Sequence, residues 1–287
     1  MPTSRSELAA AALAGRIYVA GGIAQLGKTA AFEAYDPATD LWEELPPLPE
    51  AVHHLAAAAT DKRVYVTGGY TSLLFSKITD RAWAYDPRAQ RWVRIADLPA
   101  PRAAHGMAAI EGKLYVVGGV GPKSEELWIY DPATERWDAA RAALPTQREH
   151  LTVTALDGKL HAIGGRWEDR GNLAAHEIYD PATGTWTRGP DLPTARSGLT
   201  AGVLNGHVHV TGGESLSQGR TFGAHEAYDP TTATWTALAS LPTPRHGLAS
   251  AVVGGRWYVI GGGSRAGALT FISLTGVVEV FPGKPAE

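Results

Sequence analysis

Three ionisable side chains stand at equivalent places in separate segments of the chain, at Glu7, His54 and His150. Other segments hold alanine or glycine at the same place, so packing within a repeated unit does not require the ionisable types. A carboxylate beside an imidazole can transfer protons near neutral pH, which is what general acid–base catalysis needs. We take His54 and His150 as candidate ligand-binding residues, and all three as acid–base residues if the protein is an enzyme.

Arginines stand two residues before this place in most segments. They are Arg5, Arg102, Arg148, Arg196 and Arg245, with Val52 at the remaining place. The planar guanidinium group binds carboxylates and phosphates through two parallel hydrogen bonds. We predict that these arginines bind an acidic ligand. The alternative, in which each arginine pairs with an acidic or carbonyl group of a neighbouring segment and serves only the fold, stays open.

A charged and aromatic loop occupies residues 166–172, with the sequence Arg-Trp-Glu-Asp-Arg-Gly-Asn. An exposed tryptophan stacks well on a sugar ring or on a side chain of a protein partner. We therefore include Arg166 and Trp167, together with Arg220 of a later loop, among the candidate ligand-binding residues. A solvated loop whose charges pair with one another is the alternative.

A unit that the chain repeats must position these residues. Pairs of glycines occur 46 to 50 residues apart, and Tyr-Asp-Pro follows each of the first five pairs, with a tryptophan seven residues after the tyrosine. The pairs begin at Gly21, Gly68, Gly118, Gly164, Gly212 and Gly261. Short apolar segments separated by turns such as Asp157-Gly158 predict four antiparallel strands in each unit. A period of this length with glycine and aromatic markers is typical of β-propellers.

The combination of Gly-Gly, Tyr-Asp-Pro and Trp resembles kelch repeats, of the standalone bacterial type, over nearly all 287 residues. The resemblance implies an all-β, six-bladed β-propeller in a single domain over residues 1–287, with strands A to D running outward from the centre of each blade. The blades are expected at about 5–49, 52–99, 102–145, 148–193, 196–242 and 245–282. The last unit ends before a tryptophan, so the sixth blade is expected to lack a regular outer strand unless residues 268–275 supply one.

The order of the strands assigns the loops to two faces of the propeller. Because consecutive strands are antiparallel, the links from D to A and the loops from B to C share one face. The B-to-C loops vary most between units, and variable loops on a rigid scaffold usually carry binding sites. We expect the five arginines, with His54 and His150, at the mouth of the central channel on this face.

Composition limits the classes of partner. The net charge of −3, with 44% hydrophobic and 19% charged residues, fits a compact domain and gives no basic surface for nucleic acid and no membrane-binding segment. Cysteine is absent, which excludes disulfides and thiolate metal sites. We expect no metal and no cofactor, since no zinc, nucleotide or dinucleotide motif occurs. The first residues contain no apolar signal sequence, which favours a cytoplasmic location.

We predict a binding module and scaffold that holds a protein, a peptide or an acidic small molecule at the channel mouth. An enzymatic alternative is a resemblance to the bacterial kelch N-acetylneuraminate epimerases, which interconvert sugar anomers. That resemblance implies Glu7, His54 and His150 as the acid–base residues. It also implies a clamp for the substrate carboxylate, made of Arg102, Arg148 and Arg196. We favour the binding module because the chain shows no epimerase motif beyond the repeat itself.

Overall fold

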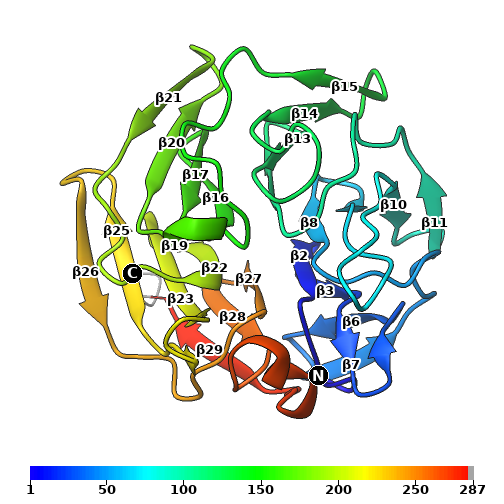
Figure 1. Cartoon of the computed structure of the whole chain (residues 1–287). Helices are drawn as coiled ribbons and strands as arrows, with labels where there is room; N and C mark the ends of the chain where they lie inside the picture. Colours follow the sequence, from blue (N-terminus) through cyan, green and yellow to red (C-terminus); the bar gives the residue numbers. More distant parts are fainter. Residues whose placement is uncertain (284–287) are drawn as a thin grey trace.

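The computed structural model describes residues 1–283, in which the main sheets form a ring around a central channel (Figure 1). Neighbouring strands within each main sheet are antiparallel. This confirms the all-β propeller fold predicted from the repeats. We number these sheets blades 1 to 6 in chain order, and call their strands A to D from the channel outward.

The first three blades have four strands each. Blade 1 contains β2 (Ala9–Leu13), β3 (Arg16–Ala20), β6 (Phe32–Asp36) and β7 (Leu41–Glu44). Blade 2 contains β8 (Ala56–Ala59), β9 (Val64–Thr67), β10 (Ala82–Asp86) and β11 (Arg91–Arg94). Blade 3 contains β12 (Gly106–Ile110), β13 (Lys113–Val117), β14 (Trp128–Asp131) and β15 (Arg136–Ala139).

Blades 4 and 5 repeat this plan, and blade 6 differs. Blade 4 contains β16 (Thr152–Leu156), β17 (Lys159–Ile163), β20 (His176–Asp180) and β21 (Thr185–Arg188). Blade 5 contains β22 (Ser197–Leu204), β23 (His207–Ser215), β25 (His225–Asp229) and β26 (Thr234–Leu238). Blade 6 contains β27 (Ala249–Val253), β28 (Arg256–Ile260) and β29 (Val278–Pro282).

Several short strands and two short helices lie on the face that carries the B-to-C loops. They are β1 (Arg5–Ser6), β4 (Ile23–Ala24), β5 (Gly27–Lys28), β18 (Arg166–Trp167), β19 (Gly171–Asn172), β24 (Arg220–Thr221) and the 3-10 helices η1 (Glu168–Arg170) and η2 (Gly267–Ile272). The segment 268–275 therefore supplies helix η2 and not an outer strand. Through residue 283 blade 6 has three strands, as its sequence predicted, and residues 284–287 of the proline-containing tail lie outside the described part. Among residues 1–283 there is no helix with the length and hydrophobicity that crossing a bilayer requires.

Side-chain size follows the distance from the channel. Each A strand contacts the A strands of the two neighbouring blades, and alanines dominate β2 and β8 where the sheets converge. The sheets separate toward the outside, and aromatic side chains fill the wider space between them. Tyr18 and Phe32 of blade 1 lie with ring centroids 6.2 and 4.7 Å from that of Tyr85 in blade 2. Such packing between blades forms the hydrophobic core.

The tryptophans on the D strands of blades 2 to 5 join each of these blades to the preceding one. Trp92 Nε1 donates a hydrogen bond to the carbonyl of Pro46 at 2.9 Å, and Trp235 Nε1 donates to that of Pro190 at 3.0 Å. Trp137 and Trp186 repeat the contact. The constant spacing from tyrosine to tryptophan thus reflects a contact between blades.

The glycine pairs are required by close approach between blades. The N–H of Gly165 donates to the carbonyl of Arg196 in the next blade at 2.9 Å. Gly164 and Gly165 have φ of 63° and 101°, and a Cβ on Gly164 would lie 2.9 Å from that same carbonyl oxygen. Glycine suits these positions because it adopts left-handed backbone conformations readily and has no Cβ atom to collide with the neighbouring blade. The last junction has the same bond, from Gly262 to the carbonyl of Arg5 at 2.9 Å.

Two histidines replace aromatic residues between blades 4 and 5. His161 and His176 occupy the places that Tyr18 and Phe32 have in blade 1, and their Nδ1 and Nε2 atoms are 2.9 Å apart. Burial lowers the pKa of His161 to about 4 and that of His176 to about 3. Both imidazoles are therefore neutral in the folded protein at mildly acidic pH, where the unfolded chain binds protons.

We predict that the double variant His161→Tyr/His176→Phe resists acid better than the wild type. As pH falls from about 6.5 toward 4, each buried neutral histidine costs up to about 1.4 kcal/mol of unfolding free energy per pH unit. Urea titrations between about pH 7 and pH 5 should show a smaller loss of stability in the variant. The exposed residue His207, changed to alanine, is the control; equal pH dependence of wild type and double variant would contradict the prediction.

Candidate binding site at the channel mouth

One residue from each blade forms a closed ring of backbone hydrogen bonds around the channel. The donors and acceptors follow one another as Glu7 to Gly247, Gly247 to Gly198, Gly198 to His150, His150 to Ala104, Ala104 to His54 and His54 to Glu7, with N···O distances of 2.7 to 3.0 Å. All six residues have positive φ, between 51° and 63°. We call this set the channel ring. Five of its residues stand two positions before an A strand, Gly198 is the second residue of β22, and the ring joins blade 6 to blade 1.

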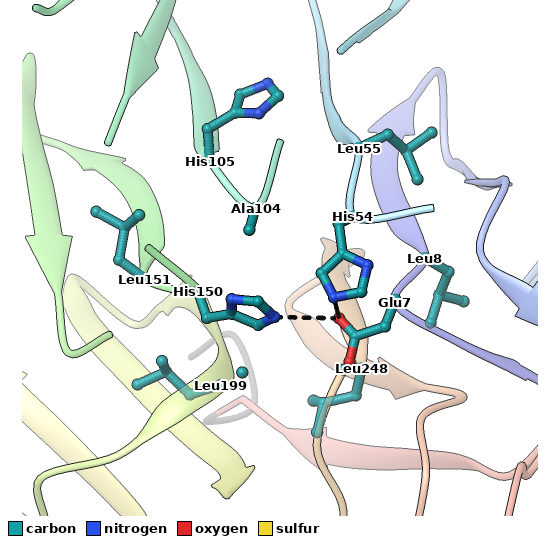
Figure 2. Close-up of a pocket in the computed structure, with 12 residues that line it drawn as sticks. Glu7, Leu8, His54, Leu55, Ala104, His105, His150, Leu151, Leu199 and Leu248 are labelled. Carbon is teal, nitrogen blue, oxygen red and sulfur yellow. Dashed lines mark ion pairs between the residues drawn. The ribbon is translucent and has the colours of Figure 1, made fainter. Parts of the chain in front are cut away.

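Three ring residues carry ionisable side chains although the backbone there favours glycine. Glu7, His54 and His150 have φ of 52°, 56° and 51°, a conformation that costs a non-glycine residue on the order of 1–3 kcal/mol. Their side chains converge over the channel, as Figure 2 shows. His54 Nε2 lies 3.3 Å and His150 Nε2 4.0 Å from Glu7 Oε2. The structure thus brings together the three residues that the sequence analysis grouped.

The five arginines are not at the channel mouth, and the expectation that they bind a ligand there is corrected. All five are fully buried: Arg5, Arg102, Arg148, Arg196 and Arg245. Four of them bind a glutamate on the C strand of their own blade, in the pairs Arg5–Glu33, Arg148–Glu177, Arg196–Glu226 and Arg245–Glu279. The left-handed backbone two residues later turns the chain, so that the ring residue faces the channel while the arginine extends into the blade.

Blades 2 and 3 lack the pair of arginine and glutamate. Arg102 has a tryptophan in place of the glutamate, and its guanidinium carbon lies 3.5 Å from the ring centroid of Trp128, with hydrogen bonds to the carbonyls of Lys123 and Glu126. In blade 2 the arginine is replaced by Val52 and the glutamate by Trp83. The arginines therefore serve the fold, as the alternative stated above had it, but their partners lie in their own blade and not in a neighbouring one.

The loop residues divide between the site and its surroundings. Arg166 reaches the site, where its Nε lies 2.5 Å from Glu149 Oε1 and its Nη1 2.6 Å from Glu214 Oε1. Trp167 lines a separate cavity of about 400 Å³ beside the site. Arg220 is exposed and stacks at 4.6 Å on Phe222. Of the three loop residues, Arg166 alone contacts the side chains around the channel ring.

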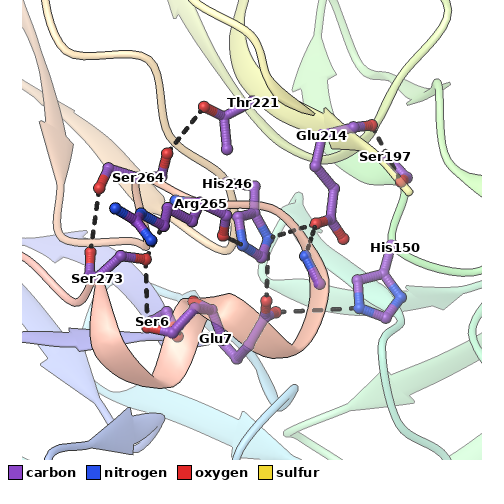
Figure 3. A network of polar contacts seen from close by, with 12 residues as sticks. Ser6, Glu7, His150, Ser197, Glu214, Thr221, His246, Ser264, Arg265 and Ser273 are labelled. Carbon is purple, nitrogen blue, oxygen red and sulfur yellow. Dashed lines mark hydrogen bonds and ion pairs between the residues drawn. The ribbon is translucent and has the colours of Figure 1, made fainter. Parts of the chain in front are cut away.

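Three further residues complete the polar cluster and were not identified from the sequence. Glu149 precedes His150, Glu214 follows a glycine pair, and His246 follows Arg245. Figure 3 shows His246 between two carboxylates, with its Nδ1 3.5 Å from Glu7 Oε1 and 3.3 Å from Glu214 Oε2. Glu149 and His246 share a unit position that holds serine or alanine in three other blades, and Glu214 has a position that holds Ile23, Tyr70 or Val120 in the first three. An ionisable type among neutral ones was the available signal.

Charge pairing dominates the electrostatics of the cluster. Burial would raise the pKa of Glu149, but contact with His150 and Arg166 outweighs it and lowers that pKa to about 2. At Glu214, too, burial would raise the pKa, but His246, the Gly267 N–H and Arg166 outweigh burial and lower the pKa. Burial, with the neighbouring His150, holds the pKa of His54 well below its usual value. Glu149 and Glu214 are therefore ionised and His54 is neutral at pH 7.

A cavity of about 220 Å³ opens above the cluster. Its floor includes Glu7, His54, His150 and Glu214, and its walls include apolar side chains of the B-to-C loops. Those wall residues are Ile23, Phe75, Leu216 and Phe271. A smaller cavity of about 90 Å³ continues into the channel beneath the same ring. The D-to-A links and B-to-C loops thus surround one cavity, as strand order required.

The antiparallel sheets form a ring, and a cavity opens at the mouth of its central channel. These features place the chain in the class of β-propellers, with a candidate site on the variable loops. The chain belongs to the kelch-repeat family: the family described as the KLHDC2/KLHL20/DRC7 Kelch-repeats domain matches residues 1–119 and 120–273.

Similar proteins include larger kelch proteins of animals and plants. Kelch-like protein 35 of Homo sapiens is 44% identical over 183 residues, which are 63% of this chain and 30% of the relative. Kelch-like protein 35 of Mus musculus is 29% identical over 181 residues, with the same two shares. The F-box/kelch-repeat protein SKIP30 of Arabidopsis thaliana is 32% identical over 69 residues, 24% of this chain and 19% of the relative. The matched part spans under a third of each of these relatives.

We predict that Arg148→Met lowers the free energy of unfolding by about 3–5 kcal/mol, because it leaves the buried carboxylate of Glu177 without a partner. The double variant Arg148→Met/Glu177→Leu removes both charges and should recover most of the loss. Denaturant titrations of the two proteins measure the difference. A single variant as stable as the wild type would show that the pair does not hold the blade together.

Proposed function

We propose that this chain is a protein-binding module that holds an apolar segment of a partner protein on its D-to-A and B-to-C face. The observation that carries the proposal is the distribution of exposed apolar side chains. Most large apolar side chains exposed in residues 1–283 lie in B-to-C loops: Leu26, Leu73, Leu74, Phe75, Leu216, Leu269, Phe271 and Ile272. We call them the apolar rim. Clustered exposed apolar surface of this kind is typical of interaction sites.

The rim and the cavity together offer what a protein interface needs. Leu216 and Phe271 contribute to the cavity wall, and Phe75 packs beside His54, with ring centroids 5.4 Å apart. An apolar side chain from a partner can enter the cavity while its neighbours cover the rim, which matches the anchored, desolvated centres of known interfaces. Because the five arginines are buried, they are not available to bind the acidic ligand that the sequence analysis expected.

The epimerase alternative loses its predicted substrate clamp for the same reason. Arg102, Arg148 and Arg196 are fully buried and bonded within their blades. Arg166, the arginine beside the acid–base candidates, is already paired with two carboxylates. A sugar carboxylate placed there would have to displace Glu149 or Glu214. These contacts favour the binding module over the epimerase alternative.

We predict that Leu216→Asp and Phe271→Asp each weaken partner binding by at least about tenfold, since a charge on the rim is desolvated when the partner docks. A phage-displayed peptide library selected on the full chain supplies the ligands, and fluorescence polarisation measures their Kd values. Leu238→Asp, on the exposed outer strand of blade 5, is the matched control. Selected peptides that bind the rim variants and the wild type equally would overturn the proposal.

A further inference from the structure

We propose that Glu7, His54 and His150 bind a divalent transition-metal ion of the Zn²⁺ class at the channel ring. This site lies on the floor of the cavity whose walls include Phe75, Leu216 and Phe271 of the apolar rim, and its test requires no partner protein. It involves one residue from each of blades 1, 2 and 4. Two imidazoles with one carboxylate form a donor set that Zn²⁺ and its neighbours in the first transition row bind well.

The geometry of the three residues suits a common ion. One donor atom from each residue lies within 4.8 Å of the other two. Bonds of about 2.0–2.2 Å to one ion require the donors to stand roughly 3–4 Å apart, so side-chain shifts of about 1 Å suffice. The side chains of Glu7, His54 and His150 are 9, 4 and 7% exposed, which removes them from competing water.

Hydrogen bonding leaves the inward nitrogen of His54 without a proton. His53 Nε2 is 3.1 Å from the carbonyl of Ser72, which can only accept, so His53 carries its proton there. Neutral His53 then accepts at Nδ1, and His54 must donate from its own Nδ1 across 2.6 Å. The remaining nitrogen of neutral His54, Nε2, presents a lone pair 3.3 Å from the carboxylate oxygen Glu7 Oε2. Two lone pairs facing each other repel unless a proton or a metal ion lies between them.

His150 is fixed in the same sense by its neighbour. Its Nδ1 donates to the carboxylate of Glu149, and its Nε2 is directed at the channel, 4.0 Å from Glu7 Oε2. Arg166 Nη2 is about equally distant from both ring nitrogens, at 3.3 and 3.2 Å, so it does not lie along the Nε2 lone pair. A carboxylate that holds the outer nitrogen of a ligating histidine is the usual outer-shell partner in metal sites.

The charges of the cluster also favour a cation. Glu7, Glu149 and Glu214 face one fixed positive charge, that of Arg166. Glu7 Oε2 is the carboxylate oxygen that faces both His54 and His150. Buried charge is costly unless it is paired or coordinates a metal.

The channel ring shows that these side chains are not needed to close the propeller. Ala104, Gly198 and Gly247 make the same backbone hydrogen bonds without a polar side chain. Glu7, His54 and His150 keep the strained left-handed conformation while bringing three donors together. Because they line both the mouth cavity and the channel cavity, a bound ion keeps positions open for water or a ligand.

The test is Zn²⁺ binding by the full chain, stripped with a chelator and dialysed. We expect about one tightly held Zn²⁺ per chain by mass spectrometry after gel filtration, with Kd from competition against a chromogenic chelator. His54→Gly/His150→Gly should weaken Kd at least about 100-fold, because two of three donors are lost. Glu149→Gln should weaken it by about 10–100-fold, the usual effect of removing such an outer partner. Co²⁺ gives a second readout through visible absorption bands that the double variant should lack.

The controls separate this site from incidental binding and from misfolding. Ala104→Gly changes the same ring position in blade 3 without removing a donor, and His207→Ala removes a surface imidazole; both should bind Zn²⁺ as the wild type does. Glycine already occupies the ring in blades 5 and 6, so the double variant should fold, which circular dichroism checks. Zn²⁺ should raise the Tm of the wild type but not of the double variant. Absent retention of Zn²⁺, or equal retention by the double variant, overturns the proposal.

Discussion

Closure of the ring is the constraint on which this structure depends. A propeller has no first or last blade in space, yet the chain has a beginning, so the junction between blades 6 and 1 must be as well bonded as the others. The bond from Glu7 to Gly247 and that from Gly262 to Arg5 reproduce there the contacts of every other junction. The hydrophobic cluster that includes Ile17 of blade 1 and Ile260 of blade 6 adds packing at the same place. Within residues 1–283, no blade combines strands from the two ends of the chain.

The same constraint creates the candidate site. Left-handed residues at the channel ring donate and accept hydrogen bonds around the axis, and this conformation aims their side chains at the channel. A side chain at one ring position therefore meets side chains from blades far away in the sequence. Glu7, His54 and His150 belong to blades 1, 2 and 4, and Glu214 and His246 come from blades 5 and 6. The site exists only when the whole propeller is closed.

The repeats predicted the fold and the grouping of loops on one face, because period and turn sequences record backbone geometry directly. They also predicted which ring residues meet, since equivalent positions converge at an axis. They did not predict where the arginines lie, because the acceptor sits on another strand: Glu33, the partner of Arg5, is 28 residues away in sequence. In blade 2, Val52 replaces the arginine and Trp83 replaces the glutamate. This joint replacement was a sequence feature that indicated the pairing. Contacts between loops, such as that of Arg166 with Glu214, have no periodic signature.

The direction of the ring hydrogen bonds has an electrostatic consequence. Each N–H in the channel ring points to the carbonyl of the adjacent blade, so the six peptide dipoles follow one another around the axis. Equal vectors around a closed circle sum to zero, so these dipoles give the channel almost no axial field, unlike a helix terminus, where they add. The ring dipoles therefore do not offset the charges of the side chains that an entering ion or molecule meets along the axis, among them the carboxyl group of Glu7.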